Sequence, residues 1–310
     1  MFQARQFEAR SINCSTMGIM QELQIRDFWE HHPCGEHHVG GLAAFAQDYE
    51  NFFREYDAFR YRREGHILGC LDGINFSDRR ILEIGLGQGA DSEQIIRRGG
   101  RWSGLDLTNE SVARVRTRLQ LRNLPYDDIR QGSALEIPYP DASFEMVFSH
   151  GVLHHIPEIG AAQAEIARVL KPDGELVIMV YAKWSFNRIV AIGLLRRLGL
   201  LAMHSLGTKP SGIYRDHLQN AQRSGLWNYM KMENFIHKNT DGPHNPYSKV
   251  YDLAEIRKDF RAFRIVKSYK RWMHGPPLPV SWLPLGKLMG WHLWVHLRSL
   301  TPNQKANRCA

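Results

Sequence analysis

Between residues 80 and 182, short apolar runs alternate with segments whose apolar residues recur at helical spacing. The apolar runs predict strands: RILEIGL (80–86), WSGLDL (102–107), YDDIRQGS (126–133, a short strand and turn), FEMVFSHG (144–151) and ELVIMVYA (175–182). The intervening segments predict helices: ADSEQIIRRG (90–99), NESVARVRTRLQLRN (109–123, with Asn109 as its cap) and EIGAAQAEIARVL (158–170). This alternation favours a parallel sheet covered by helices on both faces.

The pattern changes after Ala182. Residues 185–248 contain helical stretches and no clear strand, and YDLAEIRKDF (251–260) is again helical. FRIVKSYKRW (263–272) and GWHLWVHLRSL (290–300) predict two closing strands. A helix followed by two strands at the end of a parallel sheet is compatible with an antiparallel last strand.

Composition places the chain among ordinary globular proteins. Its 310 residues, 43% hydrophobic and 23% charged, suit one large domain with additions. The four cysteines have no paired spacing, which favours reduced thiols and a cytoplasmic protein. We see no signal peptide at the N-terminus, and no uncharged apolar run reaches about 18 residues, so we expect no membrane span.

Charge is divided unevenly along the chain. Residues 185–310 hold 20 Lys and Arg against 6 Asp and Glu, whereas residues 1–184 hold 20 against 26. A basic C-terminal part suits an anionic substrate, an anionic membrane surface or a nucleic acid, or it is simply a solvated basic face.

The stretch ILEIGLGQGAD (81–91) places glycines directly after the first strand. Such a turn lets the backbone approach a ligand closely, and Asp106, about 20 residues on, can accept hydrogen bonds from a ribose. Both features also fit a dinucleotide-binding fingerprint, Gly85-x-Gly87-x-x-Ala90. Glu83 separates the two cofactor classes, because a buried carboxylate needs backbone amides or a ligand ammonium as partners.

A set of motifs beyond the glycines resembles the class I S-adenosylmethionine-dependent methyltransferases, especially those acting on small metabolites and quinone rings. They are Glu83-x-Gly85-x-Gly87-x-Gly89, Asp106, IPYPDASFEMV (137–147), GVLHHIP (151–157) and RVLKPDGELVI (168–178). The resemblance implies an α/β fold with a Rossmann-like, seven-stranded, mostly parallel sheet whose last strand is antiparallel. We expect a helical N-terminal cap (1–60), the cofactor-binding core (61–184), a helical lid insertion (185–248) and the C-terminal part of the core (249–310).

The resemblance also implies roles for individual residues around S-adenosylmethionine. Gly85, Gly87 and Gly89 would let the backbone pass under its methionine part, Asp106 would hold its ribose, and Leu107 would lie against its adenine. The adenine would also meet Ser133 and Ala134, although the family often has aspartate in place of Ser133. Ser149 would line the passage between cofactor and acceptor. Tyr61 and Arg62, which precede the first strand, could reach the cofactor's carboxylate, a group that arginine binds well.

His154 and His155 follow the fourth strand at the mouth of the crevice. Transfer of a methyl group from a sulfonium is an in-line displacement, which needs a base only when the acceptor atom must lose a proton. A histidine suits that role, and we favour His154 over His155, with a packing or capping role as the alternative. His150, at the strand end, is interpreted as structural.

The run HHPCGEHH (31–38) contains several metal-ligating residue types. Adjacent histidines rarely converge on one ion without a defined turn, and no second cluster has ligand spacing. We therefore expect no metal site and interpret the run as part of the cap over the active site.

The lid segment RIVAIGLLRRLGLLAM (188–203) is apolar with an internal arginine pair. It predicts either a helix facing the core or a lid that meets lipid or a greasy acceptor at a membrane surface. In the loop TDGPHNPYSKVYD (240–252), Asn245 and Tyr247 are candidate acceptor contacts together with His154.

These features favour a small-molecule methyltransferase acting on an oxygen or carbon atom, with an anionic or hydrophobic acceptor. One alternative is a modifier of RNA or another macromolecule that uses the basic C-terminal region, although no RNA-binding module is evident. Others are a cofactor-binding protein without catalysis and a nicotinamide enzyme. The identity of the acceptor and the oligomeric state stay open.

Overall fold

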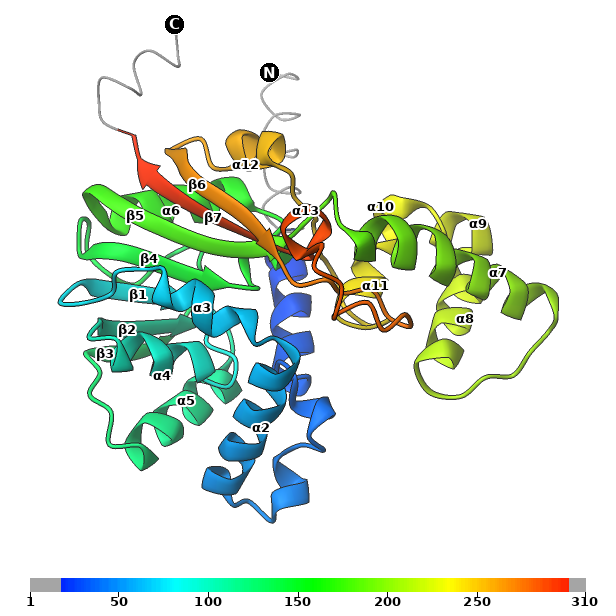
Figure 1. The fold of residues 1–310 in the computed structure, drawn as a ribbon, viewed down its shortest axis with the longest axis horizontal. Helices are drawn as coiled ribbons and strands as arrows, with labels where there is room; N and C mark the ends of the chain where they lie inside the picture. The colour runs from blue at the N-terminus through cyan, green and yellow to red at the C-terminus, as the bar shows by residue number, and fades with distance from the viewer. Residues whose placement is uncertain (1–17, 301–310) are drawn as a thin grey trace, which may run out of the picture.

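A computed structural model of the chain describes residues 18–300. Seven strands form one sheet in the order β3-β2-β1-β4-β5-β7-β6 (Figure 1). The strands are β1 Arg80–Ile84, β2 Arg101–Asp106, β3 Asp128–Gln131, β4 Phe144–His150, β5 Leu170–Tyr181, β6 Phe263–Arg271 and β7 His292–Ser299. β1 to β5 pair in parallel, whereas β7 is antiparallel to both β5 and β6. The predicted fold class, including the antiparallel last strand, is confirmed.

Helices precede, cover and extend the sheet. Residues 18–31 are helical, and the cap continues through η1 Glu36–His38, η2 Leu42–Phe45, α2 Tyr49–Arg63 and α3 His66–Asp72. The core helices are α4 Ala90–Arg97, α5 Asn109–Leu121, η3 Leu153–His155, α6 Ile159–Val169, α12 Leu253–Asp259 and α13 Gly286–Met289. The lid comprises η4 Asn187–Arg196 (a π-helical segment), α7 Arg197–Ser205, α8 Gly212–Ser224, α9 Leu226–Tyr229, α10 Met232–Phe235 and α11 His237–Thr240.

Both faces of the sheet are buried, which explains why its central strands are apolar at successive positions. Because side chains alternate across a strand, Leu82 and Ile84 of β1 pack with α6 and α12, while Ile81 packs with α3, α4 and α5 on the opposite face. The carboxyl ends of the parallel strands therefore meet at one edge, where ligands of open α/β sheets usually bind.

The start of α5 differs from the sequence prediction by one residue. Thr108, not Asn109, is the N-cap: its backbone is extended and its side chain accepts a hydrogen bond from the amide of Ser111. Thr108 also donates its hydroxyl to Asp106, so the residue that starts α5 is bonded to the residue that ends β2.

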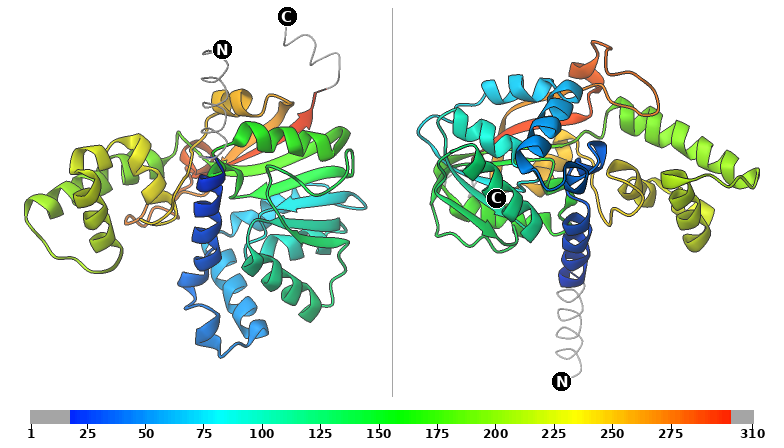
Figure 2. Two further views of the ribbon diagram at one scale, coloured as in Figure 1. Left: turned by 180° about the vertical axis from the view of Figure 1, so that it is seen from behind. Right: turned by 90° about the horizontal axis from the view of Figure 1, so that it is seen from below.

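The lid stands beside the sheet as a separate helical layer (Figures 1 and 2). It has its own apolar cluster, which includes Ile192, Leu200, Leu218 and Phe235 and joins the core at Trp291, next to β7. The segment RIVAIGLLRRLGLLAM has one buried and one exposed face, and its contact with lipid stays a prediction. Ile192 and Leu200 are buried, whereas Ile189, Leu194 and Leu198 are exposed. Within residues 18–300, no helix is long and apolar enough to cross a membrane.

Candidate active site

The glycine loop connects β1 to α4 at the carboxyl edge of the sheet. Gly85, Gly87 and Gly89 all have positive φ, at 82°, 51° and 77°. A Cβ atom at Gly85 would lie 2.1 Å from a methyl carbon of Val152, in the loop after β4. Only glycine therefore fits at position 85, because both the backbone conformation and the contact exclude a side chain.

Asp106 ends β2 and holds the glycine loop in place. Its Oδ2 accepts from the amide of Leu86 at 2.7 Å, and its Oδ1 accepts from the amide and hydroxyl of Thr108 at 2.8 and 2.7 Å. Burial raises the pKa of this carboxyl, against the lowering effect of these hydrogen bonds. Asp106 thus lies beside the loop, as a ribose ligand would, while its assignment to the ribose stays a prediction.

Glu83 is buried within β1, and its Oε2 accepts from the indole N–H of Trp102 on β2 at 2.7 Å. Burial, together with the negative charge of Asp91, raises the pKa of Glu83 to about 8. The carboxyl is therefore neutral at physiological pH. The sequence argument expected backbone amides or a ligand ammonium as its partner, and the structure provides an indole instead.

Arg60, Asp91 and His150 form a buried network beside the glycine loop. The guanidinium of Arg60 reaches Asp91 Oδ2 at 2.6 Å, and His150 Nδ1 reaches the same oxygen at 2.7 Å. Burial alone would raise the pKa of Asp91, but Arg60 and His150 hold it well below its usual range. The other oxygen, Oδ1, is buried with no hydrogen bond among the described residues. One acceptor atom therefore stays open at the loop.

Arg60 and Asp91 were missed by the sequence argument, which chose the neighbouring Tyr61 and Arg62. The hydroxyl of Tyr61 donates to the carbonyl of Ala90 at 3.3 Å, while Arg62 is exposed. The helical period of α2 contained a usable signal. Arg60 follows the buried Tyr56 by one turn and therefore shares its inward face.

The helix over residues 18–31 contacts the positions assigned to the adenine. Ser133 donates its hydroxyl to Glu22 at 2.7 Å, and the amide of Leu135 donates to Ser133 Oγ at 3.0 Å. Glu30 accepts from the first two amides of α5, those of Asn109 and Glu110. This cap helix therefore lies along the crevice edge (Figure 2).

Other residues assigned to the adenine and to the passage lie at the same edge. Ala134 is buried and Leu107 is half-buried. Ser149, near the end of β4, donates its hydroxyl to the carbonyl of Ile84, just before the glycine loop, at 2.9 Å.

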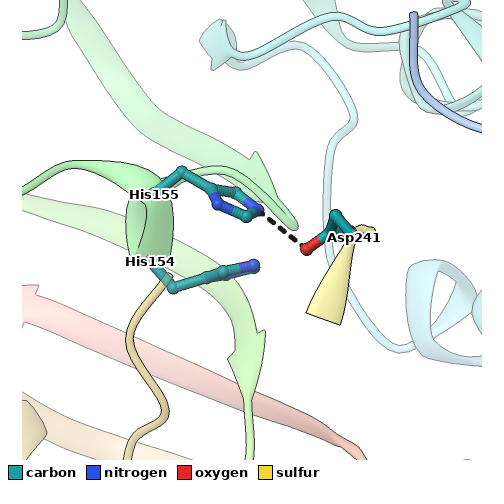
Figure 3. A group of neighbouring side chains, drawn as sticks. All are labelled: His154, His155 and Asp241. Carbon is teal, nitrogen blue, oxygen red and sulfur yellow. Dashed lines mark ion pairs between the residues drawn. The ribbon is translucent and has the colours of Figure 1, made fainter. Parts of the chain in front are cut away.

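His154, His155 and Asp241 form a second group of polar side chains (Figure 3). The two histidines belong to η3, and Asp241 directly follows α11. His155 Nε2 lies 3.5 Å from Asp241 Oδ2, and Tyr181 donates its hydroxyl to the other oxygen of Asp241 at 2.8 Å. His154 is fully buried and its ring packs on that of Tyr181, 4.0 Å between centroids. We call these four residues the histidine end, and Glu83, Asp91, Asp106 and residues 85–89 the glycine-loop end.

A family model described as a methyltransferase domain matches residues 82–178, which contain the glycine loop, Asp106 and both histidines. This segment is a class I methyltransferase domain. Its cofactor is S-adenosylmethionine, as the resemblance implied. The glycine-loop end fits that group, because the glycines at 85, 87 and 89 carry no side chains and Asp91 Oδ1, which has no hydrogen bond among the described residues, can accept from the cofactor's ammonium.

Three curated relatives resemble the chain around this methyltransferase domain. A probable S-adenosylmethionine-dependent methyltransferase of Mycolicibacterium smegmatis is 32% identical over 49% of this chain and 52% of its own length. A ubiquinone biosynthesis O-methyltransferase of Rhodopseudomonas palustris is 27% identical over 46% and 54%. A fatty-acid O-methyltransferase of Mycolicibacterium smegmatis is 33% identical over 31% and 35%. The chain spans about half the length of the first two relatives and about a third of the last.

The two histidines belong to the methyltransferase domain, and the loop over residues 240–252 contacts His155 from outside that domain. His155 Nδ1 lies 2.7 Å from the carbonyl oxygen of Tyr247. Asn245 is buried and donates to Thr240 and Ser248, so its amide group orders this loop. Tyr247 thus contacts the histidine end through its backbone, and the acceptor contacts assigned to Asn245 and Tyr247 stay predictions.

The run at residues 31–38 is not part of this group of ligands, although Cys34 and His37 lie near enough to Asp241 to interact with its charge. The Nδ1 atoms of His31 and His32 contact the carbonyl oxygens of Asp27 and Phe28, one helical turn earlier. Cys34 lies against the glycine loop, 3.6 Å from where a Cβ on Gly87 would be. The run therefore lies beside the glycine loop, and its role as a cap over the active site stays a prediction.

Proposed function

We propose that this protein transfers the methyl group of S-adenosylmethionine to an oxygen or carbon atom of a small-molecule acceptor, a metabolite, natural product or lipid-like ring compound, by in-line displacement. One observation carries the proposal. Val152 packs on the glycine loop, and His154, two residues later, has both ring nitrogens buried without a hydrogen bond among the described residues. A polar group that is free to act thus follows directly after the wall of the cofactor site.

When bound, S-adenosylmethionine supplies a methyl group on a positively charged sulfur that needs no further activation. The chain's task is then to align the acceptor, exclude water and receive any proton that the acceptor loses. His155 Nδ1 is hydrogen-bonded to the carbonyl of Tyr247, and its Nε2 lies 3.5 Å from Asp241 without a hydrogen bond. His154 is therefore the better candidate for the base, since its nitrogens are uncommitted.

The nature of the relatives favours oxygen as the acceptor atom, because two of the three are named as O-methyltransferases. Their names also refer to a quinone and to a fatty acid, both largely apolar. We infer that this chain's acceptor is apolar around the reacting atom, consistent with the aromatic surroundings of His154, where Tyr181 stacks on Trp291.

Calorimetry tests whether the cofactor binds, and turnover tests whether His154 acts as the base. We expect binding of S-adenosylmethionine and S-adenosylhomocysteine and none of nicotinamide nucleotides; the reverse result would refute the proposal. In a screen of catechols, phenols and long-chain fatty acids, release of S-adenosylhomocysteine identifies an acceptor. His154→Ala should then lower turnover by about 100-fold with cofactor affinity unchanged. Unchanged turnover would exclude His154, and the exposed lid residue His204 provides the matched control, His204→Ala.

The basic C-terminal region leaves RNA as an alternative acceptor. Methyl transfer to RNA, with binding that weakens steeply as salt is raised, would support that alternative. Cofactor binding without turnover on any acceptor would instead support a non-catalytic protein.

We further propose that the lid contacts an anionic membrane surface from which a greasy acceptor enters. Large apolar side chains are exposed on the lid and on the loop before β7, among them Leu198, Leu206, Trp227 and Trp282. Residues 185–248 add eight Lys and Arg against three Asp and Glu. Apolar side chains beside basic ones are typical of interfacial segments.

Flotation with vesicles tests this contact. Binding to vesicles that contain phosphatidylserine, and its loss in Leu206→Glu, is the expected result. Leu121→Glu is the control, because Leu121 is also exposed but belongs to α5 in the core. No binding by the wild-type protein, or equal loss in both variants, would contradict the proposal.

A further inference from the structure

His154, His155 and Asp241 bring three potential metal ligands close together. One ligand atom from each residue lies within 4.8 Å of the other two, and within residues 18–300 this is the one group of three or more such residues. Both histidines are buried and Asp241 is half-buried. Figure 3 shows both imidazole rings directed toward the carboxylate.

Four polar side-chain atoms of these three residues have no hydrogen bonds within residues 18–300. Both nitrogens of His154, Nε2 of His155 and Oδ2 of Asp241 are buried with no hydrogen bond among the described residues. A buried polar atom without a partner costs about 1–3 kcal/mol. The three residues can each turn one such atom, within 4.8 Å of the other two, toward a shared ligand.

The tautomer of His155 identifies the chemistry of that ligand. Its Nδ1 lies 2.7 Å from the carbonyl oxygen of Tyr247, which can only accept, so Nδ1 carries the proton. In a neutral ring Nε2 then presents a lone pair to Asp241 Oδ2, 3.5 Å away. Two electron donors face each other across this gap, which is the arrangement that a cation between them stabilises.

A second layer of contacts fixes two of the three ligands. Tyr181 donates to Asp241 Oδ1 and leaves Oδ2 free, while Tyr247 orients the ring of His155. Partners of this kind usually support metal-binding histidines and carboxylates. Ligand atoms around tetrahedral zinc are about 3.3 Å apart, so the His155–Asp241 pair is already near that spacing.

We propose that His154, His155 and Asp241 bind one divalent transition-metal ion, zinc foremost, at the junction of the methyltransferase core and the lid. Two imidazoles and a carboxylate are a ligand set used for zinc and iron(II), and three protein ligands leave a position open. Resting on the proposed function, we assign that position to an oxygen of the acceptor. The ion lowers the pKa of this oxygen, whose proton leaves to water before the oxygen attacks the methyl carbon and the carbon–sulfur pair stays on sulfur.

The ion and the proposed base exclude each other at one nitrogen. A His154 nitrogen that donates its lone pair to a metal cannot receive a proton at the same atom. The ion therefore replaces His154 in activating the acceptor, and the lid is tied to the core through Asp241. Asp241 is 86 residues beyond His155 in the chain, so no sequence spacing predicts this set.

Metal binding is measured on the full-length, tag-free protein after treatment with a chelator. Titration with Zn²⁺ should show one tight site per chain, and Co²⁺ should give visible absorption typical of a four-coordinate ion. Asp241→Asn and His154→Gln should each weaken the site at least tenfold, with S-adenosylhomocysteine binding retained as proof of an intact fold. The double variant His31→Gln/His37→Gln is the control, because these exposed histidines belong to the HHPCGEHH run.

Two results would overturn the proposal: no stoichiometric uptake by the wild-type protein, or loss of uptake in the control variant with retention in Asp241→Asn. Either result would leave the methyltransferase proposal intact, provided that the cofactor still binds. Conversely, absence of cofactor binding would refute the proposed function while zinc uptake stayed measurable. Once an acceptor is known, turnover that is lost on chelation and restored by Zn²⁺ would support the role of the ion.

Discussion

The two ends of the site satisfy their polar groups in different ways. At the glycine-loop end, Asp106 accepts three hydrogen bonds from residues within the core, and Glu83 is paired with Trp102. At the histidine end, four buried atoms of His154, His155 and Asp241 have no hydrogen bond in the described part of the chain. Within residues 18–300, the first end leaves Asp91 Oδ1 and Gln88 Nε2 without a hydrogen bond, whereas the second leaves four atoms of three residues unpaired and gives up more stability to keep them available for a ligand.

The largest expected effect is that of Gly85→Ala. The new Cβ would lie 2.1 Å from Val152 at a φ of 82°, so overpacking and backbone strain act together. We expect the free energy of unfolding to fall by about 4 kcal/mol, measured by urea titration. Gly69→Ala, in the middle of α3 with open space around it, should instead be neutral or stabilising. Equal effects of the two changes would show that the glycine loop is not rigid.

Glu83→Gln should change how stability depends on pH. Burial raises the pKa of Glu83 to about 8 from 4.5, so the folded state holds a proton that the unfolded state has lost. The protonated carboxyl's contribution is complete below about pH 4.5 and is lost as pH rises toward 8. Between pH 5 and 8 the wild-type protein should therefore lose on the order of 3 kcal/mol relative to the variant.

Thermal and urea unfolding across this pH range measure the effect. The exposed Glu136 supplies the control, Glu136→Gln, which should follow the wild-type curve. Parallel curves for all three proteins would mean that Glu83 is ionised in the folded state.

Asp106→Ala should weaken binding of S-adenosylmethionine at least tenfold, about 1.4 kcal/mol, in calorimetry. The change removes the predicted ribose ligand and the acceptor for the amide of Leu86. Asp127→Ala, at a partly exposed carboxylate paired with Arg101, should leave affinity unchanged. Full affinity in Asp106→Ala would refute the assignment of Asp106 to the cofactor.

The smallest effect, and of opposite sign, is expected for His154→Phe in the absence of metal. Replacing a buried ring without hydrogen bonds by an apolar ring should raise the free energy of unfolding by about 1 kcal/mol. His292→Phe should lower it, because Nδ1 of His292 is 3.0 Å from His66 Nε2. If both variants were destabilised alike, the missing hydrogen bonds of His154 would not set its contribution to stability apart from that of a paired histidine.

Much of the fold and of the glycine-loop end could be predicted because neighbouring residues determine them. The apolar runs gave the parallel strands β1, β2, β4 and β5, since a strand buried on both faces must be apolar at successive positions, whereas β3 is polar and lies at the sheet edge. The glycines could be predicted because a loop whose backbone approaches another group closely has no room for side chains, as Gly85 shows against Val152. The N-cap of α5 was wrong by one residue, because Thr108 and Asn109 are both good caps and only backbone geometry separates them.

The sequence by itself determined the class of sheet, and its resemblance to a known family indicated the cofactor and the predicted roles of Asp106, His154 and His155. Each depends on local periodicity or on residues that one strand–loop unit brings together. Only the tertiary structure decided that Arg60 reaches Asp91 and that Asp241 meets His155. These pairs join segments 31 and 86 residues apart, and their distances depend on how the cap and the lid pack against the sheet edge. That packing is a sum of many weak contacts, which no short motif encodes.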